Sequence, residues 1–206
     1  MELLAVRQKR YNHLTRLMQK LIPKIMQLGL DENQAKELVS LFNDEVSLNR
    51  NDFWLSENTI CQHLGFISAG MCRHFYYNDK GDEITRWVSL ENEFITSIGS
   101  FIRQNKTTEN IQALQPTKIL VLNKEDWESF CKKNQYAYFF WTRAIEEYLI
   151  GLEERIYSLI ALNAKDRYEL LRKTYPQIIL NVPDKYLASI LGIKSRHLSR
   201  LRAKYL

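Results

Sequence analysis

The stretch VPDKYLASILGIKSRHLSRLRAKYL, residues 182–206, constrains the fold more than any other part of the chain. It places a small residue, Ala188, four positions before a lone glycine, Gly192, with aliphatic residues spaced around both. A helix-turn-helix needs a small residue where its helices approach and a residue that tolerates positive φ in the turn. Aliphatic residues must also hold the second helix against the first. The residues that fill these positions are Leu187, Ala188, Leu191, Gly192, Ile193, Leu198 and Leu201.

Polar residues of the second predicted helix, from about residue 195 to 204, suggest what the motif does. Pro183 and Asp184 make a favourable start for the first helix, because proline costs no hydrogen bond there and an acid suits the helix dipole. In the second helix, four side chains lie away from the packing face: Ser195, Arg196, Ser199 and Arg200. They predict base contacts in a DNA major groove, where an arginine can donate two hydrogen bonds to guanine.

A second set of residues is predicted to contact DNA phosphates, which position a helix without reading sequence. These residues are Lys185, Lys194, His197 and Lys204. No acidic side chain occurs between Lys185 and the C-terminus. The alternative is a solvated basic amphipathic helix, but such a helix would not require Ala188, Gly192 and Leu198 in register.

Before this motif, the residue pattern changes from one that predicts helices to one that predicts strands, and then back to helices. Residues 1–45 predict helices, because aliphatic residues recur at spacings of three and four before Gly29, and Asp31 then caps a second helix. From about residue 46, short segments rich in aromatic and β-branched residues, such as GFISAGMCRHFYY and TKILVLN, indicate strands. The turn residues at 78–81, Asn-Asp-Lys-Gly, predict a hairpin between two of these strands.

A long helix is predicted from about residue 135 to 162. Its apolar residues alternate spacings of four and three, which is the rhythm of a two-helix seam. The seam residues are Ile145, Leu149, Leu152, Ile156 and Leu159. We therefore expect a homodimer; the alternative is that this stripe faces the chain's own core. A further helix, from about residue 165 to 173, should end at Tyr175-Pro176, because a residue before proline avoids the helical region.

Composition narrows the class of protein. The 206 residues suffice for two small domains, and a net charge of +5 with a pI of about 9.0 permits an anionic partner without demanding one. Basic residues near the start and the lack of a long apolar run predict a cytoplasmic protein with no membrane contact. Cys61, Cys72 and Cys131 are widely spaced and should be reduced, half-buried packing residues with no metal. No catalytic motif is present, which argues against an enzyme.

Two segments resemble a known family, the CRP/FNR superfamily of bacterial transcription regulators. ISAGMCRHFYYNDKGDEITRWV resembles that family's strand, glycine, strand and hairpin pattern, and VPDKYLASILGIKSRHLSRLR resembles its helix-turn-helix. The intervening ERIYSLIALNAKDRYELLRKTYPQI is similar to the linker and first helix of the family's DNA-binding domain. The resemblance covers about residue 38 to the end of the chain.

The resemblance implies an α+β fold in four parts. Residues 1–45 would be N-terminal helices, and residues 46–133 a cyclic-nucleotide-binding-like antiparallel β-roll, similar to a jelly roll, that acts as a sensory domain. Residues 134–163 would form the dimerisation helix, and residues 164–206 a winged-helix-type helix-turn-helix domain. Any wing strands would have to precede Pro183, because the chain stops soon after the second helix of the motif.

The effector is where the sequence departs from the family pattern. Members that bind a cyclic nucleotide carry a glycine turn, a glutamate for the ribose and an arginine for the phosphate, since a buried phosphate needs a charge-assisted partner. Here the expected arginine and its small neighbours align with about Thr108, Glu109 and Asn110, and Glu109 would repel a phosphate. Arg103 or Lys106 could substitute, but the glutamate and glycine turn are also unmatched. No cofactor is therefore predicted.

Other effectors of the family find little support. Iron–sulfur members need clustered N-terminal cysteines, which this chain lacks. His63, His74 and the three cysteines could ligate haem, but a lone histidine in a strand segment is more often structural. Aromatic residues of the strands and the long helix could line an apolar pocket, although such residues usually form core.

Taken together, these patterns predict a homodimeric, sequence-specific transcription regulator of CRP/FNR type. Its partners would be double-stranded DNA, a second copy of the chain, an unknown small-molecule effector if one exists, and RNA polymerase as a further candidate. The alternative is a β-roll that binds a ligand or another protein without specific DNA binding.

Overall fold

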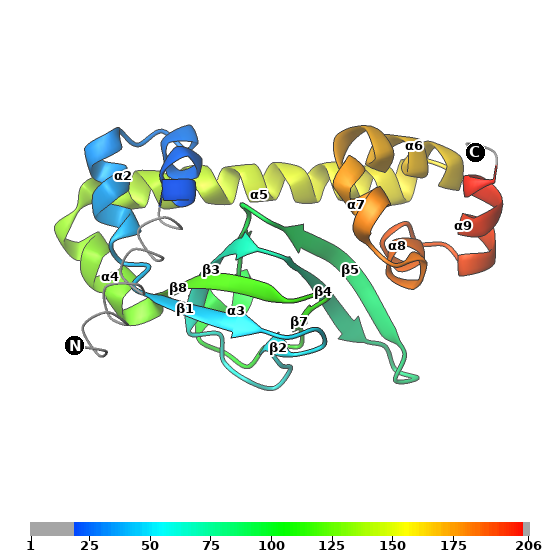
Figure 1. The fold of residues 1–206 in the computed structure, drawn as a ribbon, viewed down its shortest axis with the longest axis horizontal. Coiled ribbons are helices and arrows are strands. Elements are labelled where there is room, and N and C mark those ends of the chain that lie inside the picture. Colours follow the sequence, from blue (N-terminus) through cyan, green and yellow to red (C-terminus); the bar gives the residue numbers. More distant parts are fainter. Residues whose placement is uncertain (1–18, 204–206) are drawn as a thin grey trace, which may run out of the picture. The chain divides into compact units, whose positions relative to one another are not determined.

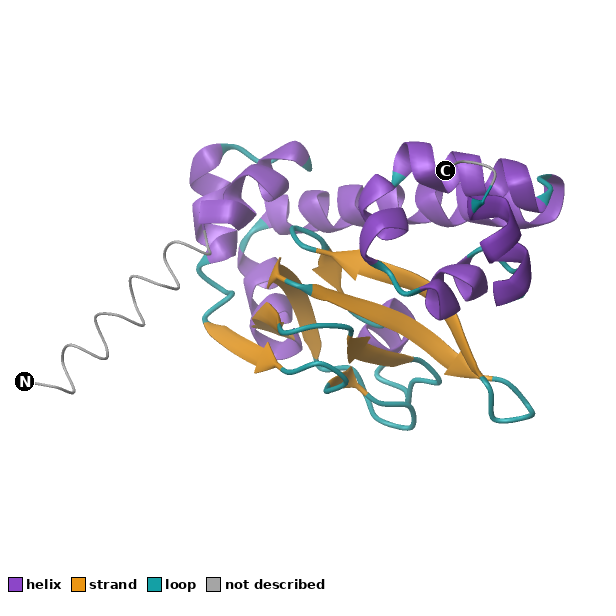
Figure 2. Ribbon diagram, turned by 45° about the vertical axis from the view of Figure 1, so that its right-hand side comes forward, coloured by secondary structure: helices purple, strands orange, loops and turns teal. Residues whose placement is uncertain are grey.

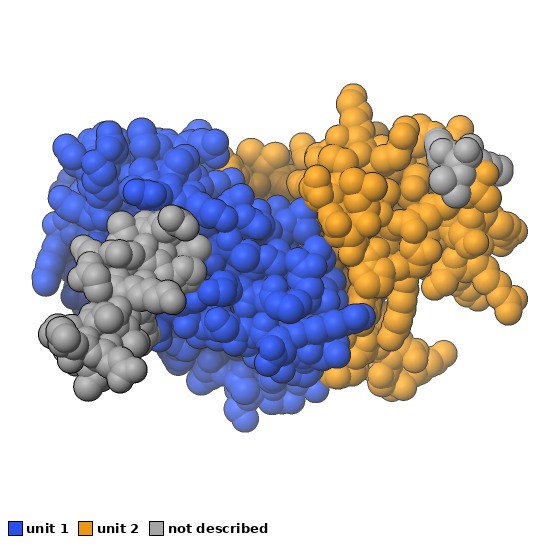
Figure 3. Space-filling model, in the orientation of Figure 1, with its two compact units in different colours: residues 1–72, 89–146 blue, residues 73–88, 147–206 orange. Residues whose placement is uncertain are grey.

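The computed structural model describes residues 19–203, which group into two compact units. One unit combines the chain up to residue 72 with residues 89–146 (Figure 3). The other combines residues 73–88 with the described chain after residue 146. Part of one strand pair therefore belongs with the C-terminal helices, a grouping that the sequence pattern does not indicate.

The first unit begins with helices, as the spacing of aliphatic residues predicts. Residues 19–27 are helical, Gly29 follows with φ +97°, and α2 spans Glu32–Val39. Asp31 caps α2, because its carboxylate accepts a hydrogen bond from the backbone N–H of Gln34. The Gln34 side chain accepts one in return from the Asp31 N–H, which completes a capping box. The part of the predicted helical region before residue 19 lies outside the described residues.

The strands form two four-stranded sheets (Figure 1). One sheet has the order β1-β8-β3-β6 and the other β2-β7-β4-β5. The strands are β1 (Asp44–Leu48), β2 (Phe53–Leu55), β3 (His63–Ala69), β4 (Met71–Tyr77), β5 (Glu83–Leu90), β6 (Phe94–Ile95), β7 (Asn110–Ala113) and β8 (Thr117–Asn123). Because β8 pairs antiparallel with both β1 and β3, the prediction of helices combined with antiparallel sheet is confirmed.

Close packing at β3 fixes where side chains of the sheet can sit. Phe66 pairs with Leu120 and both are fully buried, as are Ile67 and Ile119. Gly65 lies between these strands where a side chain would not fit: an added Cβ would come within 2.6 Å of Ile119 Cγ2. Continuous burial of both strands, together with a glycine at the closest approach, thus fixes the register of the sheet.

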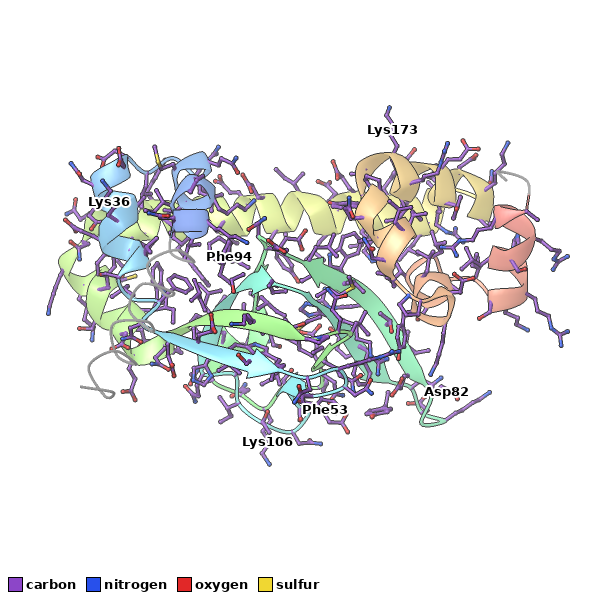
Figure 4. All side chains as sticks on the ribbon, in the orientation of Figure 1. Lys36, Phe53, Asp82, Phe94, Lys106 and Lys173 are labelled. Carbon is purple, nitrogen blue, oxygen red and sulfur yellow. The ribbon has the colours of Figure 1, made fainter. Side chains whose placement is uncertain are left out.

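The hairpin that joins β4 to β5 forms at the predicted turn residues (Figure 2). The Asn78 side-chain oxygen accepts hydrogen bonds from the N–H groups of Lys80 and Asp82, and Gly81 adopts φ +80°. These local bonds explain why asparagine and glycine are favoured in the turn. Asp82 lies at the tip of the hairpin (Figure 4).

Two helices follow the sheets. α4 spans Lys124–Lys133, and α5 spans Gln135–Ala161, which agrees closely with the long helix predicted from the sequence. The start of α5 joins the core of the first unit, where Phe140 meets Trp127 of α4 and Phe94 of β6 in edge-to-face contacts. A short helix, α3 (Ile98–Arg103), lies between β6 and β7 and was not predicted.

The apolar stripe predicted on α5 is largely exposed. Leu149 is 62% exposed, Ile156 56% and Leu159 41%, while Ile145 and Leu152 are half-buried. At these three exposed positions, the stripe therefore does not pack against the chain's own core. Ile150, Tyr157 and Ile160 are also exposed, so the apolar surface of α5 is wider than the sequence pattern predicted.

The C-terminal helices are α6 (Ala164–Thr174), α7 (Pro176–Asn181), α8 (Asp184–Ile190) and α9 (Ser195–Arg202). Asn163 caps α6 by accepting hydrogen bonds from the N–H groups of Lys165 and Asp166. Pro176 ends that helix and also occupies the first position of α7, where proline needs no hydrogen bond. The prediction of a winged-helix-type domain is wrong, because residues 124–203 contain no strand that could form a wing. The segment before Pro183 forms α6 and α7 instead.

Candidate nucleic-acid interface

Two short helices, α8 and α9, meet around a tight turn. Gly192 in the turn adopts φ +65°, a conformation that other residues rarely take. The Gly192 N–H donates to Ser189 O, and the Ile193 N–H donates to Ala188 O at 3.0 Å, which closes the end of α8. A Cβ added at Gly192 would contact Leu159 Cδ2 of α5 at 3.4 Å. Backbone conformation, rather than space, thus accounts for the glycine.

The residues predicted to hold the two helices together are brought to one interface. Ile193 is half-buried, Gly192 is exposed in the turn, and the others are buried: Leu187, Ala188, Leu191, Leu198 and Leu201. Sequence reasoning missed Ile190, which is buried with them, and placed Pro183 inside the helix whereas it is the N-cap of α8. Ala188 packs at this interface without the bulk that would separate the helices.

The predicted base-contacting residues lie on one exposed face of α9. Ser195, Ser199, Arg196 and Arg200 are all exposed, opposite the buried Leu198 and Leu201. The residues predicted to contact phosphates, Lys185, Lys194 and His197, are exposed as well, and Lys204 lies outside the described residues. The face of α9 that would meet a ligand is consequently basic, and it is not the face that packs against α8.

Arg202, the last residue of α9, has a different role from its neighbours. Its guanidinium pairs with the carboxylate of Asp184 at the start of α8 and donates to Ile179 O of α7 at 2.8 Å. Arg202 therefore ties three helices together, whereas Arg196 and Arg200 are exposed and the Arg200 side chain donates within α9, to Arg196 O. The opposite charges of Asp184 and Arg202 could have indicated this ion pair, but the sequence analysis did not use them.

Two more arginines hold the turn end of α8. Arg155 Nη2 of α5 donates to Ile190 O at 2.8 Å, and Arg167 Nε of α6 donates to Leu191 O at 2.9 Å. Arg167 also donates to Leu162 O near the end of α5. Burial, aided by repulsion from Arg86, lowers the pKa of Arg155 to about 10, so it remains charged at neutral pH. Sequence reasoning missed both residues, because carbonyl acceptors leave no trace in a sequence.

The segment where a cyclic nucleotide would bind is arranged differently from the family pattern. Ser97, the N-cap of α3, forms a hydrogen bond of 3.1 Å with Thr107, and both side chains are buried. Glu109 and Asn110, aligned with the expected arginine region, are also buried, while Thr108 is exposed.

The charges of this segment do not suit a phosphate. Its basic residues, Arg103 and Lys106, are exposed, so no cation among residues 94–113 is buried and the buried ionisable group is the Glu109 carboxyl. This arrangement does not fit a buried phosphate, which would need a cation beside it.

The three cysteines and His74 are buried, whereas His63 is exposed. Cys61, Cys72 and Cys131 are free thiols and are more deeply buried than predicted. Burial raises the pKa of Cys72 to about 12, which keeps this thiol protonated and unreactive at neutral pH. Partial desolvation lowers the pKa of His63, and His74 is buried with its ring near the Arg86 guanidinium.

Comparison with known proteins shows which family the sheet region is similar to. Residues 45–134 match the family described as the cyclic nucleotide-binding domain. This region is therefore similar to a cyclic nucleotide-binding domain. No curated protein matches the chain at a significant level. The match confirms the cyclic-nucleotide-binding-like character predicted from the sequence for the β-rich region.

Solved structures resemble the chain over most of its length. FixK2 from Bradyrhizobium japonicum has a TM-score of 0.67 and 14% identity, covering 78% of this chain and 83% of FixK2. CLP, a c-di-GMP responsive global regulator from Xanthomonas campestris, has a TM-score of 0.65 and 12% identity, covering 85% of this chain and 91% of CLP. The N-terminal domain of a transcriptional regulator from Streptomyces coelicolor A3(2) has a TM-score of 0.54 and 22% identity, covering 66% and 92%.

These likenesses establish a fold shared with regulators. The chain shares its fold with these three structures, two of which are described as coming from regulators. Within residues 19–203, no helix combines the length and the apolar character needed to cross a membrane.

The role of Arg202 as a tie between helices can be tested with Arg202→Gln. Loss of its contacts to Asp184 and Ile179 should lower the local free energy of unfolding of α8 and α9, because two charge-assisted hydrogen bonds disappear. The expected loss is about 1–2 kcal/mol, since solvent partly screens this exposed pair. Native-state hydrogen exchange of the α8 and α9 amides measures this change. The matched control is Arg200→Gln on the same helix, which should leave exchange unchanged; equal effects of the two substitutions would contradict the assignment.

Proposed function

We propose that this protein is a homodimeric transcription regulator that binds specific DNA sequences through α9. The observation that carries the proposal is the two-sided character of α9. Leu198 and Leu201 are buried against α8, while Arg196 and Arg200 are exposed on the other side. A helix that is fixed by one face and basic on the other is suited to enter a major groove. The fold shared with regulators supports the same conclusion.

Specific binding would rest on a division of labour among the exposed residues. Arg196 and Arg200 would each grip the O6 and N7 atoms of a guanine, and Ser195 and Ser199 would contact base edges or phosphates less selectively. Lys194 would neutralise a phosphate next to the start of α9. Contacts of this second kind strengthen binding to any DNA and make it sensitive to salt.

The second copy of the chain would pair through the exposed apolar stripe of α5. Leu149 and Ile156 are costly to leave in water, and their spacing suits a parallel helix pair. Such a pair would place two copies of α9 about one DNA turn (~34 Å) apart, so that they enter successive major grooves of a near-palindromic site. RNA polymerase remains a candidate partner of the DNA-bound dimer.

The proposed sensory function of the cyclic nucleotide-binding domain does not involve a cyclic nucleotide. The hydrogen bond between Ser97 and Thr107 joins two small side chains in the segment where a ribose and phosphate would need a glutamate and an arginine. Glu109 is buried nearby in the sequence and would repel a phosphate. The domain would therefore respond to a different effector or serve as a scaffold, and the protein would not be an enzyme.

Substitutions on α9 test the proposed readers. Arg196→Ala and Arg200→Ala should each reduce the preference for a specific site over random DNA by about 1–3 kcal/mol, whereas Lys194→Ala should weaken both to a similar extent. Mobility-shift titrations at moderate salt, with the DNA upstream of the protein's own gene and with random duplex, measure both affinities.

Two outcomes of that titration would count against the proposal. Equal losses on specific and random duplex for all three variants would show that the readers are wrongly assigned. Wild-type binding to the upstream DNA that is no tighter than to random duplex would favour the alternative, in which the domain binds a ligand or protein and the basic helices have no specific DNA target.

The dimer seam can be tested by introducing a charge. Leu149→Glu would place two carboxylates in an apolar seam and should convert the dimer to a monomer, as measured by analytical ultracentrifugation. Ile150→Glu is the matched control, because Ile150 is also exposed on α5 but lies outside the seam; this variant should remain a dimer. A monomeric wild-type protein, or a dimeric Leu149→Glu variant, would contradict the assignment.

A further inference from the structure

The β4–β5 hairpin contacts α8 through several side chains of the second unit. Glu83 Oε2 lies 3.5 Å from Lys185 Nζ, and the Ser189 hydroxyl donates to Thr85 O at 3.1 Å. Lys185 and Ser189 are one turn apart on α8, so the hairpin follows one face of this helix. These residues are about a hundred positions apart in the sequence, and the contact is therefore a feature of the fold rather than of either segment alone.

A buried arginine fixes the acid of the hairpin in place. Arg73 is 2% exposed, and its guanidinium lies 3.9 Å from the ring centroid of Phe75 and 4.3 Å from that of Tyr186 on α8. Its Nη1 atom donates to Glu83 Oε2 at 2.8 Å. Held in this way, the Glu83 carboxylate has little freedom to move away from Lys185, because the aromatic rings hold the guanidinium that binds it.

The charge of Glu83 persists under physiological conditions. Hydrogen bonding to Arg73, followed by the charges of Arg73 and Lys185, lowers the pKa of the Glu83 carboxyl below its usual value. Glu83 is consequently ionised at neutral pH and presents a fixed negative charge to α8.

Lys185 is also one of the residues expected to bind a DNA phosphate. Its side chain is 71% exposed, and it lies in the first turn of α8, where the basic surface begins. A carboxylate held 3.5 Å from this ammonium group occupies part of the space that a phosphate oxygen would need and repels the phosphate.

We propose that the β4–β5 hairpin is an intramolecular competitor of DNA, in which Glu83 binds Lys185 and must release it when Lys185 contacts a phosphate. This inference rests on the proposed DNA-binding function and adds its regulation: movement of the hairpin changes DNA affinity. A ligand that favours the released hairpin strengthens binding, to the extent that it binds the released form more tightly. Residues 73–88 lie within the region that is similar to a cyclic nucleotide-binding domain, yet they group with the C-terminal helices, so the restraint would link part of that region to the helices proposed to read DNA.

The test is the affinity of Glu83→Gln for DNA. Glutamine keeps an acceptor for Arg73 but removes the charge that holds Lys185, so binding should tighten about two- to five-fold on both specific and random duplex, as expected for loss of an exposed ion pair. The matched control is Asp79→Asn, which removes one negative charge from the same hairpin at a residue in its turn. This control should change affinity by less than the Glu83 variant; equal gains would show that long-range charge alone is responsible.

The same substitution in a protein that lacks Lys185 tests whether Glu83 acts through that lysine. Lys185→Gln should weaken DNA binding, and adding Glu83→Gln to it should give no further gain, since the lysine that the acid restrains is absent. A gain in the double variant as large as in Glu83→Gln alone would overturn the proposal, as would unchanged affinity in the single variant.

Hydrogen exchange without DNA separates this proposal from the proposed function. Glu83→Gln should raise the exchange rates of amides in α8 and in residues 83–88 several-fold, because the hairpin and helix restrain each other. Unchanged exchange would contradict the restraint. Failure of the wild-type protein to bind specific DNA would instead refute the proposed function, and the exchange result would still decide whether the hairpin holds α8.

Discussion

The burial of α8 against α9 is the interaction on which the proposed activity depends. These helices have seven and eight residues, and helices of this length are not stable alone in water. Leu187, Ala188 and Leu198 supply the apolar contact that stabilises them, and Gly192 allows the chain to reverse between them. Without this contact, the basic residues of α9 would have no fixed orientation, and base-specific contacts require one.

Arginine side chains extend this small core to the neighbouring helices. Arg202 joins α9 to α8 and α7, while Arg155 and Arg167 hold the carbonyl groups at the end of α8 from α5 and α6. The carbonyls at a helix end lack partners within the helix, and a cation is also favoured there by the helix dipole. The helix α5, which carries the exposed apolar stripe, therefore holds α8, and α9 packs against α8.

Local sequence signals predicted the features that arise from nearby residues. The Asp31 cap, the turn at Asn78 and the limits of α5 follow from hydrogen bonds or spacings within a few positions, and the structure has each of them. The helix α7 was missed because Pro176 was taken only as the end of α6, although proline also starts helices. The wing was predicted from family resemblance alone, and the capped, helical segments that precede Pro183 leave no strand there.

Contacts between distant residues were beyond the reach of sequence reasoning. Nothing in the sequence pairs Glu83 with Lys185 or Ser189 with Thr85, because each pair forms only when the hairpin and α8 come together. The exposed face of α9 was easier to predict, since helical periodicity separates its arginines from its leucines. The lack of the family's glutamate and arginine in the effector segment could also be predicted from the sequence, and the structure adds a hydrogen bond between Ser97 and Thr107 within that segment.

The most direct test of DNA reading by α9 is selection of binding sites from a random duplex pool with the full-length protein. The account predicts enrichment of two half-sites related by two-fold symmetry, with centres about 10–10.5 base pairs apart and guanines at the positions that Arg196 and Arg200 reach. A selected pool with no enriched sequence would contradict it, because a dimer that presents two rigid recognition helices cannot bind all sequences equally.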